Sequence, residues 1–237
     1  MKFNKIAIRI KYPFEGIIGV FLVFFALSCN ETKEIDPNSL GYDFYPIEVG
    51  QYSVYDVEEI IYEISGFDTT IFQLREIIVD SIPSIDQVTY LIRRDKRNDS
   101  SRDWEADSVW TVTKTTNFLA INENNIPFIK LTFPVNQSAS WNGNSLNSRN
   151  ELTYYYQSLE SSIIDSVGID DHIRVIIEDI EQNIVNQDIR SEVYARGIGL
   201  VSKDYLTLNY CTAGCAELGE IESGRSLKQT LIEIGNE

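Results

Sequence analysis

The chain has 237 residues, of which 43% are hydrophobic and 24% are charged, and its formal net charge is −16. A surface this acidic repels the phosphates of nucleic acids and the headgroups of anionic lipids, so the composition excludes nucleic acid as a partner. Acidity of this degree favours solubility, and it leaves room for a cationic partner or for divalent ions.

The first 28 residues have the three parts of a secretory signal peptide. Four basic residues come first, an uncharged apolar run follows over residues 17–27, and the small residues Ala26 and Ser28 lead into Cys29. The run is too short for a transmembrane helix, which needs about 20 apolar residues. We therefore predict a signal peptide over 1–28 and a polar, flexible tether over 29–41. Without the signal peptide, 16 basic and 35 acidic residues remain, a net charge of −19.

The segment Phe25-Ala26-Leu27-Ser28-Cys29 resembles the lipobox of bacterial lipoproteins, with Ala26 at a position where Leu is commoner. The resemblance implies cleavage before Cys29, lipidation of its thiol and acylation of its new amine. Two or three acyl chains hold a protein firmly on a membrane, whereas one chain is marginal. We expect a lipid-anchored protein of the outer membrane, facing either the periplasm or the cell surface.

Beyond the tether, apolar and polar residues alternate with a period of two, which indicates half-buried β-strands. Ile129 and Leu131, for example, alternate with Lys130 and Thr132. The first strand is expected to contain a bulge near Asp56. Segments of this kind, rich in Ile, Val, Thr and Tyr, follow one another over residues 52–64, 69–82, 88–93, 110–113, 129–133, 151–158, 172–180, 188–195, 200–210 and 225–234.

About ten strands joined by short turns predict an all-β domain over residues 42–237, with a single antiparallel sheet. A barrel, a half-barrel and a sandwich all fit this pattern. We favour a lipocalin-like or lipoprotein-carrier-like cup, because the strands are long and the Cys-Trp-Cys core pattern of immunoglobulin domains is missing.

Several motifs are similar to those of a group of Bacteroidetes outer-membrane lipoproteins. They include the opening stretch over 42–55, the segment Trp141-Asn142-Gly143-Asn144, and the segment Ala195-Arg196-Gly197-Ile198-Gly199. In the opening motif Ser53 replaces the usual Trp. The resemblance spans most of the mature chain and implies a β-rich, cup-like or barrel-like lipoprotein. The group has no assigned activity, so the resemblance supplies no catalytic residues.

Cys211 and Cys215 are the other two cysteines of the chain. A single pair in an exported protein predicts a disulfide. The small residues between them, including Gly214, allow so short a ring to close. A metal site would need two more soft ligands, and a redox pair would need a helix N-terminus to lower a thiol pKa.

Three aromatic residues form a candidate ligand contact. Tyr154 and Tyr156 lie on one face of a predicted strand, and Trp141 lies in a Ser- and Asn-rich loop. Together they could form a lip for a sugar or a lipid. The alternative, which we favour, is a set of cross-strand aromatic pairs that stabilise the sheet.

No other motif points to catalysis, a metal or a cofactor. Asp103, Glu105 and Asp107 alternate and could offer oxygen ligands to Ca²⁺, but the spacing of an EF-hand loop is missing. The single His172 follows two aspartates and has no recognisable Ser or Cys nucleophile beside it. We therefore predict no catalytic residue, no metal and no cofactor.

Two functions remain open from the sequence. The preferred one is a non-catalytic binding or assembly module that holds a small apolar or glycan ligand or docks an outer-membrane protein. The alternative is a hydrolase of envelope glycans that uses two carboxylates.

Overall fold

Twelve antiparallel β-strands and two short 3-10 helices make up the part of the chain that the computed structural model describes, residues 37–85, 87–157, 171–215 and 217–237. The predicted signal peptide and Cys29 lie outside these residues. The helices are η1 (Pro37–Leu40) and η2 (Tyr42–Phe44). The strands are β1 (Gln51–Glu63), β2 (Gly66–Pro83), β3 (Val88–Arg97), β4 (Glu105–Lys114), β5 (Phe118–Glu123), β6 (Ile126–Thr132), β7 (Ser140–Asn142), β8 (Thr153–Gln157), β9 (His172–Ile180), β10 (Asn186–Ala195), β11 (Gly199–Tyr210) and β12 (Ile221–Asn236).

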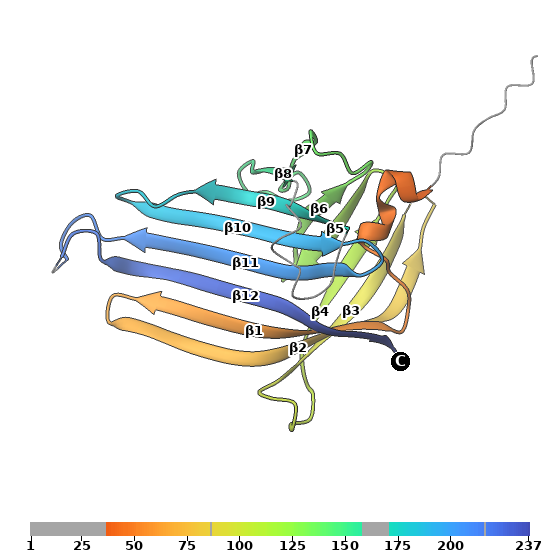
Figure 1. The fold of residues 1–237 in the computed structure, drawn as a ribbon, viewed down its shortest axis with the longest axis horizontal. Coiled ribbons are helices and arrows are strands. Elements are labelled where there is room, and N and C mark those ends of the chain that lie inside the picture. The colour runs from red at the N-terminus through yellow and green to blue at the C-terminus, as the bar shows by residue number, and fades with distance from the viewer. Residues whose placement is uncertain (1–36, 86, 158–170, 216) are drawn as a thin grey trace, which may run out of the picture. The chain divides into compact units, whose positions relative to one another are not determined.

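All twelve strands belong to one sheet, in the order β6-β5-β4-β3-β2-β1-β12-β11-β10-β9-β8-β7. The first and last strands pair with each other from Gln51↔Asn236 to Glu63↔Ser223, and this ladder joins the two halves of the sheet. In Figure 1, β1, β2 and β10–β12 cross the front of the view, and β3–β5 run behind them at a steep angle. The sheet therefore curls into a nearly closed barrel, which confirms the predicted all-β class.

The barrel closes where the edge strand β6 meets β7 and β8, mainly through side chains. The backbone N–H of Ile129 donates to the carbonyl of Gly143 at 2.9 Å, and the indole Nε1 of Trp141 donates to the carbonyl of Ile129 at 2.9 Å. The hydroxyl of Tyr156 serves both backbone groups of Thr132, at 2.8 and 2.7 Å. An edge strand must satisfy its free N–H and C=O groups, and here two aromatic side chains take the place of a neighbouring strand.

The N-terminal 3-10 segment packs against one end of the barrel. The N–H of Val135 donates to the carbonyl of Leu40 at 3.0 Å. The Nζ of Lys114 donates to the carbonyls of Tyr42 and Tyr45, each at 2.8 Å. The last residues of the tether predicted over 29–41 are thus part of the ordered fold.

Next to the N-terminal 3-10 segment, alternate side chains of the strands fill the barrel and form the main apolar core. Because side chains alternate across a strand, each strand sends every second residue inward. The buried members of this core are Phe44, Ile78, Ile92, Val112, Leu119, Ile121, Leu131, Phe133, Tyr154, Tyr156, Val175, Ile177 and Tyr194.

The predicted strands match the observed ones closely, and two differences are instructive. The bulge expected near Asp56 in the first strand lies in the last strand instead. The pairing of β1 with β12 shifts between Val54 and Tyr55, which face Glu233 and Leu231, so the extra residue is Ile232 of β12. The strand β5 was not predicted as a separate element. It forms a hairpin with β6 through Asn124 and Asn125, which both adopt positive φ angles, of 51° and 66°. Asparagine tolerates this conformation better than most residues, so the Asn-rich turn is well suited to a tight hairpin.

Candidate functional site

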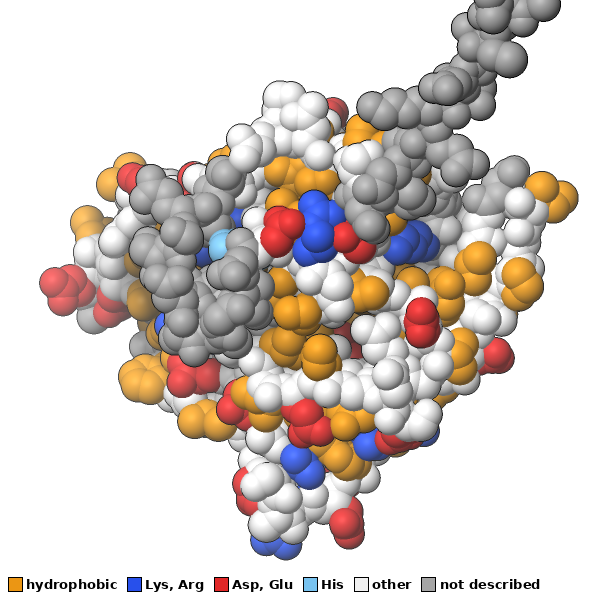
Figure 2. Space-filling model, turned by 45° about the vertical axis from the view of Figure 1, so that its right-hand side comes forward, with side chains coloured by type: hydrophobic (Ala, Val, Ile, Leu, Met, Phe, Trp, Pro, Cys, Tyr) orange, Lys and Arg blue, Asp and Glu red, His pale blue; other side chains and the backbone are white. Residues whose placement is uncertain are grey.

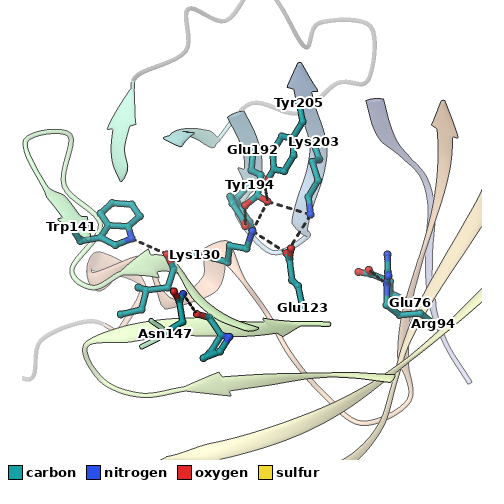
Figure 3. Close-up of polar contacts among 12 residues, drawn as sticks. Glu76, Arg94, Glu123, Lys130, Trp141, Asn147, Glu192, Tyr194, Lys203 and Tyr205 are labelled. Atoms are coloured by element: carbon teal, nitrogen blue, oxygen red, sulfur yellow. Dashed lines mark hydrogen bonds and ion pairs between the residues drawn. The ribbon is translucent and has the colours of Figure 1, made fainter. Parts of the chain in front are cut away.

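Four charged side chains meet in the barrel interior, and we call Glu123, Lys130, Glu192 and Lys203 the charged cluster (Figure 3). Lys130 Nζ lies 2.9 Å from Oε1 of Glu123 and 2.9 Å from Oε1 of Glu192. Lys203 Nζ contacts the same two carboxylates at longer distances, 3.4 and 3.3 Å. Two cations and two anions therefore compensate each other inside the sheet, as buried charges must.

A β-bulge brings Lys130 into this cluster. In the pairing of β5 with β6, Leu119 faces Leu131 and Ala120 faces Ile129, so Lys130 is the extra residue of β6. An extra residue interrupts the alternation of faces. Lys130 is only 2% exposed, although the sequence pattern places it on the face opposite to Ile129 and Leu131. The simple period-two expectation was wrong for this residue.

Glu192 is the centre of the charged cluster, with a side chain that is 1% exposed. Besides both lysines, it accepts hydrogen bonds from the hydroxyls of Tyr194 at 2.6 Å and Tyr205 at 2.5 Å. Burial alone would raise the pKa of Glu192, but the two ammonium groups and the two hydroxyls outweigh burial and lower it. The carboxylate therefore stays ionised.

In the same cluster, the pKa values of Glu123 and Lys130 are also set by burial and by their charged neighbours. Burial opposes the charge of Glu123, but Lys130 and Lys203 lower its pKa below the ordinary value. Burial would lower the pKa of Lys130, but Glu123 and Glu192 raise it well above its usual range. At neutral pH Glu123, Lys130 and Glu192 are therefore all charged.

A second set of polar contacts lies on the opposite wall, from β2, β3 and β4, and Figure 3 shows two of its members, Glu76 and Arg94. Arg94 Nε donates to Oε1 of Glu76 at 2.9 Å, and its guanidinium lies 3.6 Å above the ring of Trp110. Lys96 Nζ lies 2.8 Å from Asp107 and 4.8 Å from the ring of Phe72. Arg94 also lies 3.8 Å from Asp107, so each of the two cations has an aromatic face and at least one carboxylate beside it.

Between these two walls the barrel holds a pocket of about 390 Å³, which we call the interior pocket. It is lined by side chains from β1, β2, β3, β4, β5, β11 and β12, and by the turn after β5. Binding pockets for small molecules typically measure about 300–1,000 Å³. Lys203 and Glu123 form part of its lining, whereas Lys130 and Glu192 lie behind them.

Two neutral donors that line the interior pocket have no hydrogen-bond partner among the described residues. They are the side-chain amide Nε2 of Gln229 and the indole Nε1 of Trp110. Gln229 is only 4% exposed. Leaving such a buried donor unpaired costs about 1–3 kcal/mol, so a molecule that accepts a hydrogen bond from it is favoured at this place.

The three aromatic residues singled out in the sequence come together, but they do not line the interior pocket. Tyr154 and Tyr156 are each 3% exposed and belong to the apolar core. Trp141 is half-buried and packs against both, with ring centroids 6.1 and 4.7 Å apart. Next to them the side chain of Asn147 donates to the carbonyl of Pro127 at 2.8 Å (Figure 3). Ligand contact by the trio stays a prediction, and the contacts seen are those of packing and barrel closure.

Cys211 and Cys215 form a disulfide in the connection between β11 and β12. Backbone hydrogen bonds tie the same connection together: the N–H of Cys211 donates to Glu220 at 2.9 Å, and the N–H of Gly219 donates to Cys211 at 3.0 Å. The bridge lies in the loop, so it contributes no group to the interior pocket.

The acidic triplet Asp103, Glu105 and Asp107 does not converge on one point. Asp107 pairs with Lys96, while Asp103 and Glu105 are exposed. Among the described residues, no three or more His, Cys, Asp or Glu side chains form a group that could hold a metal ion. His172 is half-buried at the start of β9, and neither of its ring nitrogens has a partner in the described part of the chain.

Sequence reasoning missed the charged cluster because its four members come from four strands. One signal was present: Lys130 interrupts the apolar run Phe128-Ile129-Lys130-Leu131. A charge inside such a run is uncommon unless it is paired.

Comparisons with known proteins add little to this geometry. No protein-family model and no curated protein matches the chain. One similar solved structure comes from Bacteroides fragilis and is described as a "putative exported protein with YmcC-like fold". It is 11% identical, covers 81% of this chain and 99% of its own, and has a TM-score of 0.40. A likeness this distant carries no argument about function.

Among the residues that the structure describes, no helix is both long enough and apolar enough to cross a membrane.

Proposed function

We propose that this chain is a lipid-anchored outer-membrane protein whose β-cup binds a small ligand without transforming it. The predicted signal peptide over residues 1–28 and the lipobox-like segment that ends at Cys29 support the anchor. The interior pocket supports the binding role, because it is large enough for a small molecule and because two of the residues that line it carry buried N–H donors without a partner in the described part of the protein. A ligand acceptor would remove the cost of these unpaired groups.

The geometry favours binding over hydrolysis by paired carboxylates. A glycosidase of this kind needs one carboxylic acid with a raised pKa to protonate the leaving group. In the charged cluster the lysines lower the pKa of both Glu123 and Glu192, so both are ionised at neutral pH. Such a pair stabilises and orients charge, but it does not donate a proton.

The test uses the full chain, purified from native membranes in mild detergent, with small molecules released by denaturation and identified by mass spectrometry. Leu227 lines the interior pocket, so Leu227→Trp should fill it. Thr230→Trp is the matched control, because residues 227 and 230 lie on opposite faces of β12. We expect a small molecule to accompany the wild type and the control but not the filled variant, provided that circular dichroism shows both variants folded. Equal recovery from all three proteins, or none from any, would overturn the proposal.

A further inference from the structure

Basic side chains outnumber acidic ones in the lining of the interior pocket, whereas acidic and basic side chains are interspersed on the face of the protein that Figure 2 shows. Four basic and three acidic side chains line it, in a chain whose net charge is −16. Each of these cations lies within 4 Å of a carboxylate, and two of those carboxylates, Glu76 and Glu192, belong to residues outside the lining. The cations therefore supply the pocket with charged N–H donors that a ligand can share. The basic side chains are Arg94, Lys96, Lys203 and Arg225, and the acidic ones are Glu59, Asp107 and Glu123.

The polar groups that await a partner in the pocket are donors. Gln229 Nε2 and Trp110 Nε1 are N–H groups without a partner in the described part of the chain. The amide of Gln229 belongs to a side chain that is 96% buried, so solvent does not easily satisfy it. A ligand that fits this pair must present acceptor oxygens.

Lys203 is the buried cation best placed to meet such a ligand. Its Nζ lies 3.3 and 3.4 Å from the two carboxylates of the charged cluster, whereas charge-assisted N–H···O bonds are usually about 2.7–2.9 Å long. Lys130 already provides the shorter contacts to the same oxygens, at 2.9 Å each. The ammonium of Lys203 therefore has only long contacts to give up when it turns toward the pocket.

The walls of the pocket favour a hydrophilic ligand over an acyl chain. Its three aromatic rings each lie against a cation: Trp110 against Arg94 at 3.6 Å, Phe72 against Lys96 at 4.8 Å, and Tyr205 against Lys203 at 5.3 Å. These ring faces are covered by charged groups, so they do not form a continuous apolar wall.

From these observations we infer that the interior pocket recognises an anionic oxygen group, a carboxylate or a phosphate, carried by a small hydrophilic molecule of sugar size. The anion lies near Lys203 and Arg225, and its oxygens accept from Gln229 and Trp110, whose buried N–H groups turn toward the ligand when it binds. This inference rests on the proposed function and specifies the chemistry of the ligand.

Titration calorimetry on the full chain in detergent tests the inference with four probes: glucose, glucuronate, glucose 6-phosphate and inorganic phosphate. We expect at least one anionic sugar to bind about tenfold or more tightly than glucose, and more weakly as salt rises. Glucuronate against glucose 6-phosphate shows which anion is preferred, and inorganic phosphate shows whether the anion alone suffices.

Three variants locate the binding. Arg225→Gln removes a half-exposed cation of the pocket, and Gln229→Leu removes the buried donor at similar size. Lys228→Gln is the control, since it makes the same charge change on the outward face of the same strand. We expect the first two to weaken binding of the anionic sugar about tenfold and the control to leave it unchanged.

Equal binding of glucose and the anionic sugars, or equal effects of Arg225→Gln and Lys228→Gln, would overturn the inference while the cup remains a binding site. If no probe binds, the molecule released from the native protein decides: an anionic one supports the inference, and a neutral or purely apolar one overturns it. If no molecule is released either, the proposed binding function fails as well.

Discussion

Lys130 Nζ lies 2.9 Å from Oε1 of Glu192, although 62 positions separate the two residues and their side chains are only 3% and 1% exposed. Lys130 comes from β6 and Glu192 from β10, strands that are far apart in the order of the sheet. Their contact therefore exists only when the sheet has curled. The same two side chains contact Glu123 and Lys203, which line the interior pocket. Closure of the barrel therefore also positions part of the pocket wall.

Removing one member of this pair should be costly. Lys130→Met leaves Glu192 and Glu123 buried with a single, more distant ammonium, and breaking a buried pair usually costs about 3–5 kcal/mol of unfolding free energy. Urea unfolding followed by circular dichroism measures the loss. Arg225→Gln is the comparison, because it breaks the half-exposed ion pair with Glu59 and should cost about 0–1 kcal/mol. Equal losses in the two variants would contradict a special role for the charged cluster.

The charged cluster also predicts how stability depends on pH. The pKa values of Glu123 and Glu192 are lowered in the folded state, so their contribution is fully present above the unfolded pKa of about 4.3 and is lost as the pH falls through the folded values. The pKa of Lys130 is raised, so its contribution is present below about pH 10.4 and is lost as the pH rises through the folded value.

We therefore expect the unfolding free energy to fall steeply below about pH 4 and again in strong alkali. Denaturant titrations at a series of pH values measure both limbs. Glu192→Gln should flatten the acid limb, while Glu58→Gln, a change on the exposed side of β1, should leave it as in the wild type. An acid limb that is the same in all three proteins would show that other groups govern acid unfolding.

Gly143 should not tolerate a side chain. A Cβ atom at this position would lie 2.4 Å from the ring of Tyr154, a distance that real Cβ contacts do not reach. Gly143→Ala should therefore destabilise the fold by about 1–3 kcal/mol, the usual cost of overpacking. Thermal and urea unfolding measure the effect. In a Tyr154→Leu background the same change should cost clearly less, because the ring is gone; an undiminished cost would mean that the clash is not its cause.

The lipid anchor is tested at Cys29. Cys29→Ser should abolish labelling by a fatty-acid probe in cells and release the protein from the membrane fraction, because the serine cannot carry the thioether-linked lipid. Cys211→Ser is the control, since it also removes a cysteine but should leave labelling and membrane association intact. Labelling that persists in Cys29→Ser would show that the lipobox interpretation is wrong.

Much of the fold could be read from local patterns in the chain. Alternation of apolar and polar residues located most strands within a few residues, as for β9, predicted and found over His172–Ile180. The presence of one cysteine pair, Cys211 and Cys215, in a chain with an export signal predicted the disulfide. Both features involve residues that are close together in the sequence, so the sequence alone is enough to predict them.

The interior pocket could not be read in this way. Lys130 turns inward because of a bulge in β6, and a bulge changes the parity of every residue that follows without a strong signal of its own. Gln229 and Trp110 resemble ordinary strand residues in the sequence, and only the curled sheet shows that both face the same cavity. The aromatic residues that stood out in the sequence, Tyr154 and Tyr156, instead fill the core near the barrel closure.

The sequence by itself determined the all-β class, the approximate strands and the disulfide, because each of these follows from short-range chemistry: the period of the strand and the proximity of two thiols. Only the tertiary structure decided the pairing of β1 with β12, the closure of β6 against β7 and the meeting of Lys130 with Glu192. These contacts join residues that are far apart in the chain, and the free energy that selects them comes from burying and pairing groups across the whole barrel.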